Sequence, residues 1–179
     1  YTFDIDGNAT GTKGIITKVG EDEKKEPLDG AVFGLYTDSE CTQPYTNDSG
    51  TLTDHNGDYA SANTVESDAE GQLHISGLAA GTYYLKELAA PNDYSVNTHV
   101  FEIVISATYN TNGTLASWNV TIDGKEAASF TVDHTSGTPE VDDSITGIDI
   151  KNTKLSSLPS TGGIGTTIFT IGGCVIMIA

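Results

Sequence analysis

Short segments in which apolar and polar residues alternate constrain the fold of this 179-residue chain more than any other feature. In "VFEIVI" (residues 100–105), Phe101, Ile103 and Ile105 would point to one side of a strand and Glu102 to the other. The same alternation occurs in "AVFGLY" at 31–36, "QLHI" at 72–75, "SWNVTI" at 117–122 and "SFTV" at 129–132. No stretch before residue 164 keeps a helical period. The pattern predicts an all-β sandwich whose strands each have one packed and one solvated face.

The formal charge of −17 excludes nucleic acid as a partner, because nucleic-acid binding needs a basic surface. The four histidines, at positions 55, 74, 99 and 134, do not have the spacing of metal ligands, and there is no glycine-rich phosphate loop. The sequence therefore predicts neither a metal nor a cofactor, and no enzyme activity.

An uncharged, mostly apolar run, residues 164–179, ends the chain and follows directly on "LPSTGG" at 158–163. We interpret this run as a membrane helix, somewhat shorter than the roughly 20 apolar residues of a full span, and we expect that the natural segment is longer. A helix buried in the core is the alternative, but the glycines and threonines of the run are unusual in such a helix.

Three segments with apolar alternation each continue it with one polar residue. Lys18 follows Ile16 in "GIITKVG", Glu87 follows Leu85 in "GTYYLKEL", and Asn152 follows Ile150 in "GIDIKN". One explanation is that each strand end emerges into solvent. The other is chemical: a desolvated lysine is a nucleophile, and a desolvated glutamate tends to its neutral acid form. Together with an asparagine carboxamide, they would be complete for an amide-forming reaction that releases ammonia.

The residues around these positions resemble a known family. "ITKVGEDEKKEPLDGAVFGLY" (16–36) is similar to the opening of Cna-B-type domains, and "YYLKELAAPNDY" (83–94) is similar to their glutamate motif, with Leu88 in place of a threonine and Asp93 in place of a glycine. With "LPSTGG", the chain resembles the C-terminal domain of SpaA-type pilins of Gram-positive bacteria. The resemblance implies an Ig-like (Cna-B-type) β-sandwich.

It also implies an isopeptide bond between the side chains of Lys18 and Asn152, formed with Glu87 as the catalyst. In this interpretation the protonated Glu87 polarises the Asn152 carbonyl while the neutral Lys18 amine attacks it. Holding both reactants in place supplies about 7–11 kcal/mol of the barrier.

The stretch Leu158, Pro159, Ser160, Thr161, Gly162 resembles a sortase sorting signal. Pro159 would keep the backbone extended, Thr161 would present the scissile carbonyl, and Gly162 would be an unhindered leaving amine. A sortase cysteine would form an acyl-enzyme at Thr161, which an amine of a neighbouring pilin subunit or of a peptidoglycan precursor would resolve. The apolar tail would hold the substrate at the membrane until then.

These inferences divide the chain into four parts. Residues 1–13 are a leading strand or the end of an upstream domain, 14–153 the sandwich, 154–161 the linker with the sorting motif, and 162–179 the tail that sortase removes. Because the chain starts at Tyr1, we expect it to be the C-terminal piece of a longer protein.

The function that follows is a secreted, cell-wall-anchored structural subunit, stiffened by the Lys18–Asn152 bond. The alternatives are the stalk of an anchored adhesin and the anchor domain of a surface enzyme. Host surface ligands are a partner class that the sequence leaves open.

Overall fold

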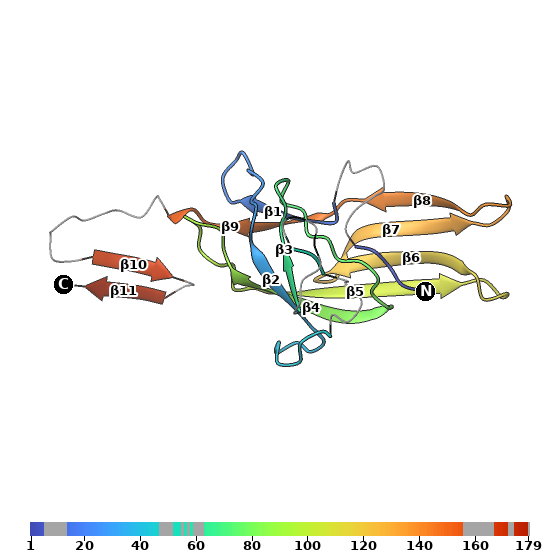
Figure 1. Cartoon of the computed structure of the whole chain (residues 1–179), viewed down its shortest axis with the longest axis horizontal. Helices are drawn as coiled ribbons and strands as arrows, with labels where there is room; N and C mark the ends of the chain where they lie inside the picture. Colours follow the sequence, from blue (N-terminus) through green and yellow to red (C-terminus); the bar gives the residue numbers. More distant parts are fainter. Residues whose placement is uncertain are drawn as a thin grey trace.

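The computed structural model describes residues 1–5, 14–46, 52–54, 56, 58 and 63–155, and the backbone of 167–171 and 174–178. The predicted sorting motif at 158–162 lies outside these residues. The elements β1 to β11 are all strands, which confirms the prediction of an all-β fold (Figure 1).

Seven strands form one antiparallel sheet in the order β3-β2-β4-β5-β6-β7-β8. Their bounds are β2 Val32–Tyr36, β3 Thr64–Glu66, β4 Gly81–Ala89, β5 Val100–Tyr109, β6 Leu115–Ile122, β7 Lys125–Asp133 and β8 Glu140–Ile145. Figure 1 shows that β5 to β8 extend together toward one end of the molecule.

The remaining two strands of the sandwich, β1 (Ile16–Gly20) and β9 (Ile148–Asn152), pair in parallel although they are the first and last strands of the domain. On its other side β1 contacts the segment that begins at Gly71, through the Lys18 amide, which donates to the Gly71 carbonyl. The first and last strands of the domain thus lie side by side, with the start of β1 next to the start of β9.

The core is a single cluster of buried apolar side chains between these layers. Most residues that the alternation predicts to face inward are buried in it, among them Phe33, Leu35, Leu73, Ile75, Ile103, Ile105, Val120, Ile122 and Phe130. Phe101, Trp118 and Val132 are partly buried and pack against it. Alternation in the sequence therefore identified the packed face of the sheet correctly.

Two strands of the seven-stranded sheet were not predicted. β8 carries the sequence "EVDDSI", whose side chains are exposed apart from a half-buried Ile145, so it has no apolar alternation to identify it. β3 lies within residues 37–70, which are rich in Asp, Ser, Thr and Asn and show no apolar alternation. Conversely, the segment 72–75, which the alternation predicts to be a strand, forms only isolated bridges. Backbone pairing with a neighbour, which a single segment does not encode, decides these cases.

Residues 1–5 pack into the same core. Phe3 exchanges two backbone hydrogen bonds with Leu78, of 2.8 and 3.0 Å, and its ring centroid lies 4.9 Å from that of Trp118. Trp118 in turn stacks on Phe130 at 3.9 Å. Phe3 and Ile5 are buried, at 3% and 0% exposure, so this segment completes the core over β6 and β7.

We expect Phe3→Ala to lower the free energy of unfolding by about 3–5 kcal/mol, the usual cost of a phenylalanine cavity. For a domain of this size the melting temperature should fall by roughly 10–20 °C in thermal denaturation. The exposed neighbour Thr2, replaced by alanine, serves as the control and should change little. An unchanged melting temperature of Phe3→Ala would show that residues 1–5 contribute no stability.

The C-terminal tail differs from its prediction. The backbone of Thr167–Ile171 (β10) and Cys174–Ile178 (β11) pairs as an antiparallel hairpin, and not as the expected helix. The physical reason lies in composition: both runs are rich in β-branched residues, and the sequence between them is Gly-Gly, a hairpin signal. Among the described residues, no helix is long and apolar enough to cross a membrane.

Candidate functional site: a buried lysine, glutamate and asparagine

Lys18, Glu87 and Asn152 lie in the interior, with exposed fractions of 0%, 2% and 2%. They come from β1, β4 and β9. Each therefore occupies an inward position of its strand, as the alternation predicts, and none emerges into solvent at a strand end. Ionisable side chains are rarely fully buried unless they are paired, so this cluster needs a specific explanation.

The parallel register of β1 and β9 determines how Lys18 and Asn152 are placed. Lys18 lies opposite Ile150, and Gly20 lies opposite Asn152, so the lysine and the asparagine are two positions apart on neighbouring strands. The Lys18 amine donates to the Ile150 carbonyl at 2.9 Å. This is the one hydrogen bond of that amine within the described residues, and an ammonium group with three donors would be poorly satisfied there.

The Glu87 carboxyl group is held by two donors. The Asn152 side-chain amide donates to Oε1 at 2.8 Å, and the backbone N–H of Asn97 donates to Oε2 at 2.6 Å. The side-chain oxygen of Asn152, Oδ1, is buried and has no hydrogen-bond partner among the described residues. The carboxyl group thus contacts the nitrogen of the carboxamide, whereas the sequence analysis expected it to polarise the oxygen.

Burial shifts both titratable groups toward their neutral forms. The pKa of Lys18 falls to about 8, mainly because burial disfavours the ammonium, and the negative charge of Glu87 offsets part of this fall. The pKa of Glu87 rises, mainly through burial, against the hydrogen bonds from Asn97 and Asn152 and the charge of Lys18. A neutral amine and a neutral acid beside a carboxamide are the reactants of an acyl transfer to the amine.

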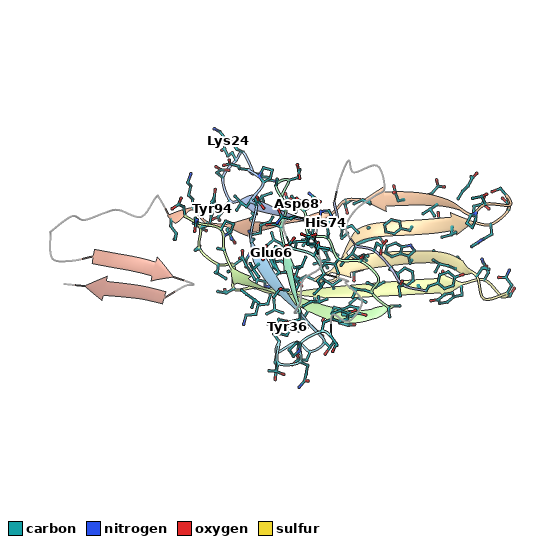
Figure 2. The ribbon with its side chains drawn as sticks, viewed as in Figure 1. Lys24, Tyr36, Glu66, Asp68, His74 and Tyr94 are labelled. Carbon is teal, nitrogen blue, oxygen red and sulfur yellow. The ribbon has the colours of Figure 1, made fainter. Side chains whose placement is uncertain are left out.

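A segment that the sequence analysis noted only at its start, through Asp93, completes the cluster. Residues 93–97, here called the strap, run antiparallel to the end of β9, with an isolated bridge between Tyr94 and Lys154. Figure 2 shows Tyr94 at the end of the sandwich where the chain leaves β9. Asp93, which takes the place of the family's glycine, has a φ of 72°. Aspartate tolerates this left-handed conformation, so the substitution keeps the shape of the turn.

The described residues contain no group of three side chains that could hold a metal ion.

Two protein-family models match the chain. One is described as SpaA, a prealbumin-like fold domain, and matches residues 12–119. The other is described as an LPXTG cell wall anchor motif and matches residues 150–179.

Known proteins with similar sequences or structures are surface and pilus proteins. The chain is 29% identical over 194 residues to the trypsin-resistant surface T6 protein of Streptococcus pyogenes serotype M6, covering 86% of this chain and 33% of that protein. It therefore spans about one third of that relative's length.

Two solved structures are similar at lower identity. GBS52, the minor pilin of Streptococcus agalactiae, is 22% identical, with a TM-score of 0.45, covering 89% of this chain and 46% of that one. The group B streptococcus pilus 2b backbone protein is 21% identical, with a TM-score of 0.45, covering 81% and 42%.

Proposed function

From its membership of the SpaA prealbumin-like domain family, we propose that this pilin-like surface protein, which carries a cell wall anchor motif, is a structural subunit. In this proposal a sortase links it covalently into a pilus or to the wall. We further propose that an isopeptide bond between Lys18 and Asn152 locks the domain. The burial of three mutually dependent polar side chains, Lys18, Glu87 and Asn152, is the observation that carries this second part.

The reaction balances within the cluster. The neutral Lys18 amine attacks the Asn152 side-chain carbonyl carbon, so that a Nζ–Cγ bond forms and the Cγ–Nδ2 bond breaks. Glu87 delivers one proton to Nδ2, which departs as ammonia, and takes up the proton that leaves Nζ, so that the carboxyl group ends in its initial protonation state. The 2.8 Å contact between Glu87 Oε1 and Nδ2 suits this role, because the carboxyl group already lies on the leaving nitrogen.

The lowered pKa of Lys18 makes the reaction accessible near neutrality. With a pKa of about 8, roughly one molecule in ten carries the neutral amine at pH 7, against fewer than one in a thousand at the usual lysine value. A single slow turnover is enough, since the product is permanent.

The sortase step is proposed from the motif alone. Attack on the Thr161 carbonyl would release Gly162 and the tail, and a lysine amine of another subunit or a peptidoglycan precursor would take the acyl group. The family assignment favours a pilus subunit, and the stalk of an anchored adhesin is the second candidate.

Wall extracts of the source bacterium, boiled in SDS and probed with an antibody to this domain, distinguish the two. A pilus subunit should give a ladder of bands spaced by one subunit, because covalent polymers survive SDS. The ladder should disappear when the cognate sortase gene is deleted. A single anchored species without a ladder would overturn the pilus assignment in favour of the stalk.

A further inference from the structure

The strap, residues 93–97, contacts both Glu87 on β4 and the chain around the end of β9, which bears Asn152. The Asp93 carbonyl accepts from the Leu155 amide at 2.7 Å, and the Thr153 carbonyl accepts from the Ser95 amide at 3.0 Å. These bonds lie on the side of β9 away from β1. The strand that bears Asn152 therefore lies between the strand that bears the lysine and the strap.

Asn97 is the residue at which the strap meets both reacting elements. Its backbone N–H donates to Glu87 Oε2 at 2.6 Å, and its side-chain amide donates to the Lys151 carbonyl at 3.1 Å. Its side-chain oxygen accepts from the His99 amide at 3.0 Å. One residue thus fixes the Glu87 carboxyl group, the backbone next to Asn152 and the entry into β5.

We infer that Asn97 is a positioning residue for amide formation, which sets the Glu87 carboxyl group on the Asn152 amide when β9 docks against the strap. This inference rests on the proposed function, because it presupposes the Lys18–Asn152 reaction. Asn97 touches neither reacting atom, and it acts through Glu87.

Because of this arrangement, the site is complete only after β9 has paired with the rest of the domain. Glu87 lies on β4, which pairs with β2 and β5 and makes no strand pairing with β9. Without β9, the Asn97 side chain loses its contact with the Lys151 carbonyl, and the Glu87 carboxyl group loses the Asn152 amide. The acid is therefore fixed in its reactive orientation only when the acceptor is already in place.

The test compares Asn97→Ala with the wild type in refolding. Chain recovered unfolded from inclusion bodies is diluted into buffers over a range of pH, and samples are quenched at timed intervals. Intact mass then reports the fraction that has lost ammonia, while the fluorescence of Trp118, the single tryptophan, reports folding. Asn92→Ala is the matched control, since Asn92 is an exposed asparagine of the same loop.

We expect bond formation in Asn97→Ala to be about tenfold slower than in the wild type, with Asn92→Ala unchanged. The backbone N–H of Asn97 lowers the pKa of Glu87. Asn97→Ala keeps this N–H but removes the side-chain contact with the Lys151 carbonyl that holds it in place. As the N–H moves off the carboxyl group, the limb of the pH profile that depends on Glu87 should move to higher pH. A structural role alone would not move that limb. Lys18 is the charged group that acts on Glu87, and its own limb should stay in place.

Three outcomes separate the possible failures. An Asn97→Ala rate equal to that of the wild type overturns the positioning role. A slower rate of bond formation in Asn97→Ala with an unshifted pH profile also overturns the positioning role, if Asn97→Ala causes an equivalent loss of stability. That loss is measured by thermal unfolding in a Lys18→Ala background, where no bond can form. A wild type that keeps its full mass overturns instead the proposed bond, whatever Asn97 does.

Discussion

Folded wild-type domain is expected to weigh one ammonia less than its sequence, and Lys18→Ala or Glu87→Gln should restore the full mass. Both variants should also lose roughly 4–5 kcal/mol of unfolding free energy, because the proposed bond between Lys18 and Asn152 would close a loop of nearly the whole domain in the unfolded chain. The melting temperature should fall by about 10–20 °C. Intact mass spectrometry and thermal denaturation measure the two effects on the same samples.

The matched control is Lys86→Ala, which removes an exposed lysine from the strand that carries Glu87. It should keep the reduced mass and a melting temperature near that of the wild type. Glu87→Gln keeps the size of the side chain, so its loss of stability cannot be assigned to a cavity. Wild-type domain that retains its full mass after folding and long incubation would contradict the bond.

The same prediction has a pH signature in Asn152→Ala, which cannot react and therefore keeps the Lys18 amine. The pKa of that amine is about 8 in the folded state and 10.5 when unperturbed. Between these values the unfolded chain binds more protons, so the free energy of unfolding should rise as the pH increases from about 8 to 10.5. Below pH 8 the penalty of the buried ammonium is present in full. Wild-type domain, whose amine is consumed, should lack this rise in chemical denaturation.

The second large effect concerns attachment. Thr161→Ala should abolish covalent linkage of the protein to the wall fraction, because it changes the side chain of the residue that presents the scissile carbonyl and thereby the proposed sorting signal that sortase would bind. The wild-type protein released from the wall should end at Thr161, with Gly162 and the tail absent. Mass spectrometry of the C-terminal peptide measures this directly.

Thr166→Ala, four residues beyond Gly162, is the control and should leave attachment intact. Recovery from the wall of chains that extend past Gly162 would speak against cleavage at this position. Attachment that persists in Thr161→Ala would place the processing site elsewhere.

The packed face of the sheet could be predicted from the sequence because burial imposes a period of two. Phe33, Leu35 and Leu85 lie in the core for that reason. The same rule placed Lys18, Glu87 and Asn152 inside, since each continues an apolar face. The rule could not predict which strands pair. β1 and β9 are neighbours although they lie far apart in the sequence, and no local pattern encodes their register.

The rest of the site could not be predicted from the sequence, for a different reason. Asn97 contributes a backbone N–H to Glu87, and every residue except proline has one, so its side chain carries no signature of that contact. The preference of Glu87 for the carboxamide nitrogen is a matter of side-chain orientation. β8 escaped prediction because an exposed edge strand needs no apolar side chains.

The parallel pairing of β1 and β9 has a mechanical consequence. In parallel strands the chain enters both at the same end, so tension on the two ends of the domain pulls β1 backward from its start and β9 forward from its end (Figure 1). The two strands are then loaded in shear, and their five registered residue pairs must yield together. An antiparallel pair pulled from one end would open one hydrogen bond at a time. Resistance to stretching is thus a property of the strand order itself, and a covalent link between β1 and β9 would carry the load past every strand between them.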